Sequence, residues 1–118
     1  MKVIYKHYRI PQSKQLPDRS NPALLQNLCM RWYKDGRGFG GGRIPQPHGR
    51  GGVTECLVVD PQSKLVIAGG AAYCSTQDNF EYSKGREIAL RRAMVDLRVR
   101  HDAITSVVSS LPDLQEQK

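Results

Sequence analysis

The sequence predicts an α+β fold: a small antiparallel sheet of about three strands, two helices packed on one face, and a long Gly/Arg-rich loop. Three observations support this. Short stretches rich in β-branched and aromatic residues alternate with turn residues, two apolar stripes recur at helical spacing, and one segment is nearly half glycine. The 118 residues fit a single domain, 1–118.

Three stretches are expected to be strands. Val3 to Ile10 is dense in β-branched and aromatic residues and is followed by a proline. Val53 to Val59 and Leu65 to Cys74 have a similar character and are joined by Asp60 to Lys64, an Asp-Pro segment typical of a turn. The last two stretches therefore predict a hairpin. The Gly69-Gly70 pair within it predicts a bulge or a close backbone approach.

The first helix is expected to begin at Asn21-Pro22, because Asn can cap a helix and Pro fits its first position. Apolar residues then recur at helical spacing from Leu24 to Trp32. We expect the helix to stop near Gly36.

The second helix is expected to start at Asp78 or Ser83, with Asp78 and Glu81 spaced as a capping box, and to run to about Val108. The tail from 109 to 118 is expected to be frayed. One apolar stripe should face the core and half-bury its histidine; it comprises Leu90, Ala93, Met94, Leu97, His101 and Ile104.

Positive charge is concentrated in the first half of the chain. Of the net charge of +7, residues 1–52 contribute +8 and residues 53–118 contribute −1. Eight of the seventeen residues from 36 to 52 are glycine, so this segment is expected to be a mobile basic loop. A one-sided positive field attracts polyanions, either nucleic acid or an acidic protein surface.

The sequence gives little indication of catalysis or of export. No run approaches the roughly 20 apolar residues of a membrane span, and no signal peptide is visible, so we expect a soluble, cytoplasmic protein. The three cysteines are odd in number and lack metal-ligand spacing. Gly36-x-Gly38-x-x-Gly41 follows a predicted helix instead of a strand, which argues against a dinucleotide site. We therefore expect a non-enzyme without metal or cofactor.

The Arg/Gly segments 36–43 and 49–52 resemble the RGG boxes of RNA-binding proteins. Arginine pairs with phosphate and stacks on bases, and glycine lets the backbone approach them. Together with the basic residues of the first strand and the last helix, this predicts a nucleic-acid or partner-binding set of Lys2, Lys6, Arg9, Arg37, Phe39, Arg43, Arg50, Lys84, Arg86 and Arg91.

Two resemblances suggest a biological setting. The β-β-α order from Val53 to Arg92 is similar to the second half of double-stranded-RNA-binding domains, with Lys84 and Arg86 in the phosphate-contacting region. The segments 51–54, 72–80 and 84–93 resemble small bacteriophage and prophage accessory proteins of the anti-CRISPR type. The second resemblance implies a phage protein acting in the host cytoplasm.

Three functions remain open at this point. The first is a phage-type inhibitor of a host nucleic-acid-guided nuclease, a ribonucleoprotein, which acts by occupying a nucleic-acid-binding surface. The second is autonomous binding of RNA or DNA by an architecture like that of a double-stranded-RNA-binding domain. The third is a structural module that forms a homodimer through the sheet edge.

Overall fold

The computed structural model describes residues 1–16, 21–33 and 46–109 and confirms the α+β class. Residues 36–45 of the predicted loop (36–52) and residues 110–118 of the predicted tail (109–118) lie outside the described residues. In chain order, the elements are β1 (Lys2–Arg9), α1 (Pro22–Leu28), β2 (Met30–Tyr33), β3 (Arg50–Val59), β4 (Val66–Asn79) and α2 (Tyr82–Ser109).

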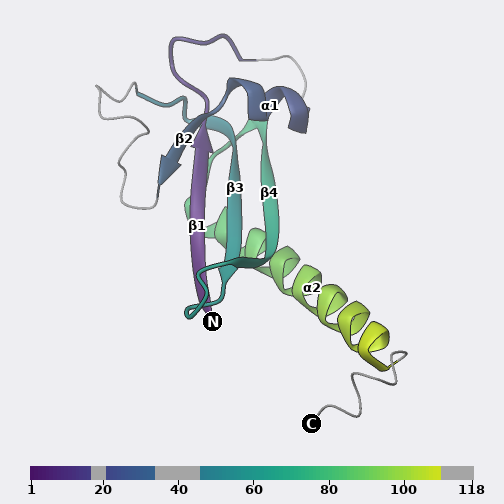
Figure 1. The fold of residues 1–118 in the computed structure, drawn as a ribbon. Coiled ribbons are helices and arrows are strands. Elements are labelled where there is room, and N and C mark those ends of the chain that lie inside the picture. The colour runs from purple at the N-terminus through teal and green to yellow at the C-terminus, as the bar shows by residue number, and fades with distance from the viewer. Residues whose placement is uncertain (17–20, 34–45, 110–118) are drawn as a thin grey trace.

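The described strands form one antiparallel sheet in the order β2-β1-β3-β4 (Figure 1). In its centre, Tyr5 of β1 lies opposite Cys56 of β3, and Cys56 lies opposite Gly70 of β4. The prediction of about three strands is therefore wrong by one strand, β2, which occupies one edge.

The extra strand arises where the first helix was expected to continue. The Asn21 side-chain oxygen accepts hydrogen bonds from the N–H groups of Ala23 and Leu24, so the predicted start is confirmed. The helix ends at Leu28 instead of near Gly36, because Cys29 adopts an extended backbone (φ −78°, ψ 136°). The next four residues pair with β1, and this tertiary pairing overrides the helical spacing.

The β3–β4 hairpin is confirmed but is longer than predicted. The Asp60 carboxylate accepts hydrogen bonds from the Gln62 N–H and the Ser63 hydroxyl, which fixes the turn. Strand β3 starts at Arg50 instead of residue 53, and β4 continues to Asn79 instead of residue 74. The end of the predicted Gly/Arg loop is therefore part of the sheet.

The two helices pack on opposite faces of the sheet, so the prediction that they share one face is wrong. Val53 and Thr54 are neighbours in β3 and point to opposite sides. Val53 packs in a small core with Leu25 of α1, whereas Thr54 lies against Gly85 of α2. The main core lies between the sheet and α2 and contains Cys56, Val58, Ala68, Ala72, Ala89 and Ala93.

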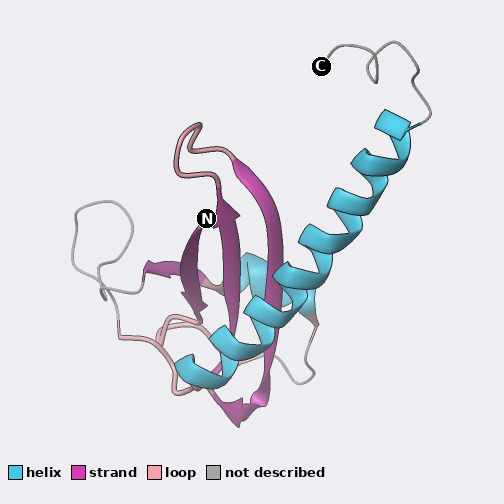
Figure 2. Ribbon diagram, turned by 90° about the horizontal axis from the view of Figure 1, so that it is seen from below, coloured by secondary structure: helices cyan, strands magenta, loops and turns pink. Residues whose placement is uncertain are grey.

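Helix α2 crosses the sheet face and then continues beyond it (Figure 2). Neither predicted cap is used: Asp78 lies in β4, and Ser83 lies inside the helix. The predicted apolar stripe packs only in its first part, where Ala93 is fully buried. Ile104 is 63% exposed and His101 is exposed, because the sheet ends before the helix does.

Two side chains of α2 cover the outer edge of β4. The Asp96 carboxylate accepts a hydrogen bond from the Gly69 N–H (3.0 Å), and Arg92 donates one to the Ala71 carbonyl (2.6 Å). Among the described strands, β4 lies at this edge of the sheet, so these groups have no partner strand there. Side chains of α2 thus make hydrogen bonds to edge backbone groups of β4 that are not paired with another strand.

Neither helix, over the described residues, combines the length and the apolar character that crossing a bilayer requires.

Candidate functional site

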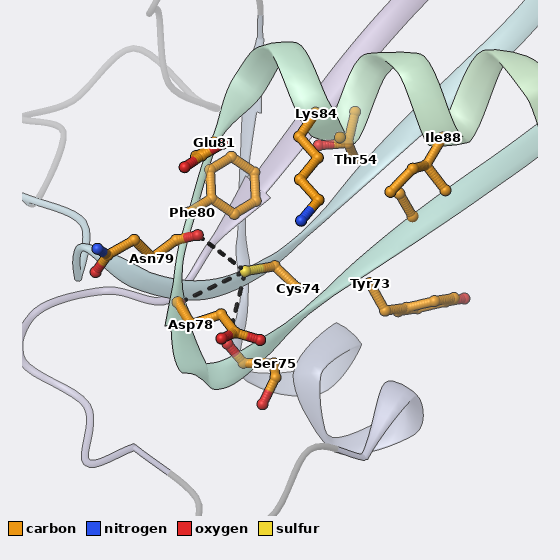
Figure 3. Close-up of a pocket in the computed structure, with 12 residues that line it drawn as sticks. Thr54, Tyr73, Cys74, Ser75, Asp78, Asn79, Phe80, Glu81, Lys84 and Ile88 are labelled. Carbon is orange, nitrogen blue, oxygen red and sulfur yellow. Dashed lines mark hydrogen bonds between the residues drawn. The ribbon is translucent and has the colours of Figure 1, made fainter.

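A pocket of about 380 Å³ lies between the end of β4 and the first two turns of α2 (Figure 3). Its walls come from three adjacent parts of the chain: β4, the two-residue corner that follows it, and α2. Thr54 of β3 also contributes. The lining residues are Thr54, Ala72, Tyr73, Cys74, Ser75, Asp78, Asn79, Phe80, Glu81, Lys84, Gly85 and Ile88.

The thiol of Cys74 is held by the backbone of the pocket. It lies 3.6 Å from the carbonyl oxygens of Ser75 and Asp78 and 3.4 Å from that of Asn79 (Figure 3). A carbonyl oxygen only accepts, so the thiol must be the donor. Burial raises the pKa of the Cys74 thiol above its usual value. The sulfur is therefore a protonated donor and a poor nucleophile at neutral pH.

Charged side chains of both signs line the pocket. Lys84 extends from α2 toward Cys74 (Figure 3). Asp78 and Glu81 also belong to the lining, and all three charged residues are exposed. The pocket can therefore contact an anionic group on the Lys84 side and hydrogen-bond donors on the Asp78 side.

Phe80 connects the pocket to a buried cluster of aromatic and basic residues. The Arg9 guanidinium lies 4.4 Å from the centroid of the Phe80 ring, and Tyr82 packs edge-to-face against the same ring at 5.2 Å. Arg9 also donates hydrogen bonds to the Tyr82 hydroxyl (2.8 Å) and to the His48 carbonyl (2.6 Å). This cluster ties the end of β1 to the corner between β4 and α2.

His7 completes the cluster as a neutral side chain. It is fully buried, its Nδ1 lies 3.1 Å from the Thr54 hydroxyl oxygen, and its Nε2 has no hydrogen-bond partner among the described residues. Burial, together with the positive charges of Arg86 and Arg9, lowers the pKa of His7 to about 4. We infer that Nδ1 carries the proton, since an unpaired lone pair at Nε2 costs less than an unpaired N–H.

Two glycines allow these groups to come together. A Cβ on Gly52 would lie 2.6 Å from the Phe80 ring, and the φ of Gly52 is +143°. A Cβ on Gly85 would lie 2.5 Å from the Thr54 hydroxyl oxygen. Larger residues at either position would push the corner or α2 away from the sheet.

The structure separates the basic residues that the sequence grouped together. Arg9, predicted as a binding residue, is only 8% exposed, because its guanidinium is enclosed by aromatic rings and a carbonyl. Lys2 and Lys6 lie on the β1 face opposite α2, since the alternate residue His7 faces α2. Arg50 is exposed at the start of β3. Arg37, Phe39 and Arg43 lie outside the described residues.

Of the predicted residues of α2, Lys84 lines the pocket, whereas Arg86 and Arg91 do not. Lys84 lines it and is exposed, and Arg86, one turn into the helix, is partly buried. Arg91 is exposed and lies 3.2 Å from Glu87. With Arg98, which is also exposed, Lys84 and Arg91 form a line along α2 that we call the basic stripe (Lys84, Arg91, Arg98).

Sequence reasoning missed most of the pocket. Of the residues that line it, only Lys84 belongs to the predicted binding set, and the sequence indicates for Cys74 only that it lacks metal-ligand spacing. The seven-residue spacing that includes Arg98 is the one signal that was available for the stripe. The pocket itself has no local signal, because it forms only where β4 meets α2.

The pocket offers hydrogen bonding, one cation and an aromatic wall, but no metal site. No three His, Cys, Asp or Glu side chains within residues 1–16, 21–33 and 46–109 are close enough to hold an ion. Comparison of the chain with protein-family models, curated proteins and solved structures finds no match. The function must therefore be argued from the site itself.

Proposed function

We propose that the protein is a nucleic-acid-binding module that contacts the sugar–phosphate backbone through the basic stripe of α2. Helix α2 contains six Lys and Arg residues and three Asp and Glu residues. It therefore carries a net charge of +3, although residues 53–118 as a whole carry −1. Phosphate contacts from Lys and Arg dominate sequence-independent binding to nucleic acids.

The alignment of the stripe is the observation that carries this proposal. Residues seven apart on a helix lie about 10 Å apart and drift by only about 20° around the axis. Lys84, Arg91 and Arg98 are all exposed and therefore present a row of cations. The ion pair of Arg91 with Glu87 is about 70% exposed on both sides, so a phosphate can displace the carboxylate at little cost.

We further propose that the protein is an inhibitor of a host nuclease, as the resemblance to phage accessory proteins implies. The protein would inhibit a host nucleic-acid-guided nuclease, a ribonucleoprotein, by occupying a surface that normally holds RNA or DNA. This inhibition would depend on the basic stripe of α2. The resemblance of the sequence to phage accessory proteins is what supports the inhibitory role. Autonomous binding is the simpler alternative and requires only the stripe.

No dimer through the β4 edge is proposed, since Arg92 and Asp96 already cover that edge at Gly69 and Ala71.

The binding test compares two variants with the same change in net charge. One replaces the stripe (Lys84→Gln, Arg91→Gln, Arg98→Gln). The matched control replaces three exposed lysines away from α2 (Lys2→Gln, Lys14→Gln, Lys64→Gln). Binding to a fluorescently labelled blunt duplex is measured by anisotropy as salt increases from about 50 to 200 mM.

The stripe variant should lose affinity, and its log–log salt slope should fall by about two to three, because each lost phosphate contact removes about 0.9. The control should keep most of its slope. Equal losses in both variants would show that binding follows net charge instead of the stripe. Absence of wild-type binding at the lowest salt would overturn the proposal.

The inhibitory role has its own readout. Adding the wild-type protein to reconstituted nucleic-acid-guided nucleases should reduce cleavage, and the stripe variant should not. Intact cleavage across several effector types, despite excess protein, would leave autonomous binding as the function.

A further inference from the structure

We propose that the pocket between β4 and α2 holds one unpaired nucleobase of the strand whose backbone follows the basic stripe. This inference rests on the proposed function and specifies its substrate: nucleic acid with an unpaired base, either at an overhang or extruded from a duplex. A volume of about 380 Å³ lies at the small end of ligand pockets, which suits a ligand no larger than one nucleotide.

Lys84 connects the two surfaces. It is the first residue of the stripe and also lines the pocket, where it extends toward Cys74 (Figure 3). A phosphate bound by Lys84 would therefore lie at the mouth of the pocket, with the attached base within reach of the interior. Bases inside a duplex are stacked and cannot enter such a pocket.

Phe80 provides a fixed aromatic wall. Its ring is held by the Arg9 guanidinium at 4.4 Å and by Tyr82 at 5.2 Å, and it lies against Gly52. A ring that is already immobilised loses little entropy when a base packs against it. Such base–aromatic contacts tolerate any base, because every base has a π-face.

The β4 side of the pocket can contact the edge of a base. The Asp78 carboxylate accepts hydrogen bonds only, while the Ser75 hydroxyl accepts one from the Gln77 N–H (3.2 Å) and can still donate its own hydrogen. The Asn79 amide points away from Cys74 (Figure 3), so this residue contributes its backbone carbonyl to the wall. An acceptor at the position of Asp78 favours bases with an exocyclic amino group, such as cytosine or adenine. Asp78 repels phosphate, so a base must supply a compensating hydrogen bond for Asp78 to favour binding.

The test uses the fact that the charge of Asp78 opposes binding, whereas its hydrogen bond to a base would favour binding. Asp78→Ala removes a negative charge, which by electrostatics alone would tighten binding to any nucleic acid. Its matched control is Asp102→Ala, an exposed carboxylate near the far end of α2. Affinities are measured for three probes: a blunt duplex, the same duplex with a cytidine overhang, and the duplex with an abasic overhang of equal length.

For the wild-type protein, the cytidine overhang should bind at least about fivefold more tightly than the abasic overhang, from the stacking contribution alone. Asp78→Ala should reduce this ratio, even though the variant is more positive. Asp102→Ala should leave the ratio unchanged.

The two proposals fail separately. Blunt-duplex binding with a normal salt slope, but equal affinity for the cytidine and abasic overhangs, would overturn the pocket assignment and leave the stripe intact. A ratio that Asp78→Ala leaves unchanged would also overturn it. Loss of all binding by the wild-type protein would overturn the proposed function itself.

Discussion

The adjacent glycines Gly69 and Gly70 have different roles in β4. A Cβ on Gly70 would lie 2.4 Å from the Ala93 nitrogen and 2.6 Å from the Ala89 oxygen, both backbone atoms of α2. The nearest atoms to a Cβ on Gly69 lie 3.5 Å away, an ordinary contact. Gly70 therefore sets how closely α2 approaches the sheet, as the close-approach prediction for this pair required.

Gly70→Ala should lower the free energy of unfolding by about 1 to 3 kcal/mol, because the backbone of α2 must move outward. Gly69→Ala is the matched control and should have little effect. Chemical denaturation of both variants measures the difference. Equal stabilities would show that α2 can shift without loss of packing.

His7 predicts a pH dependence of stability. Its pKa is lowered from 6.5 to about 4 in the folded protein, so the unfolded chain binds the proton more readily between these values. The contribution of His7 is fully present above pH 6.5 and is lost as the pH falls toward about 4. Denaturation measured across this window should show decreasing stability in the wild type and a shallower slope in His7→Gln. Identical slopes would contradict the assignment.

At the scale of the elements, helix α2 forms the core with the sheet and also covers backbone groups at the outer edge of β4. Asp96 and Arg92 lie one turn apart and satisfy the N–H of Gly69 and the carbonyl of Ala71. The bond from Gly69, followed by that from Arg100, lowers the pKa of the Asp96 carboxyl. Its stabilising effect is therefore present above the ordinary carboxyl pKa and is lost as the pH falls through the lowered value.

Asp96→Ala should destabilise the protein more than Asp102→Ala, because only Asp96 accepts a bond from the strand edge. The opened edge should also favour self-association. Thermal unfolding and light scattering over a range of protein concentrations measure both effects. If the two variants behave alike, the Asp96 contact does not protect the edge.

The element boundaries show where sequence patterns were sufficient. Asn21, Pro22 and the Asp60 turn were predicted correctly, because capping and turn bonds involve residues only two or three positions apart. The end of α1 was predicted incorrectly. Residues 30–33 fit a helical spacing, but they pair with β1, a segment more than 20 residues away in the chain.

For the whole molecule, the position of a charge matters more than the total. The surplus in the first half of the sequence suggested a single cationic surface, but Arg9 is buried and Lys2 and Lys6 lie across the sheet from α2. Among the described residues, an exposed row of cations lies on α2, where Lys84, Arg91 and Arg98 have regular spacing. The acidic residues that balance the second half lie mostly outside this helix.

By itself, the sequence determined the α+β class, the hairpin, the start of α1 and the end of α2. Each of these depends on local bonds or on the periodicity of one segment. Only the tertiary structure decided which face each helix covers, that Arg9 is enclosed beside Phe80, and that Lys84 meets Cys74 in a pocket. Some of these features bring together residues that are far apart in the chain, and others depend on how neighbouring segments pack. A short-range sequence pattern predicts neither.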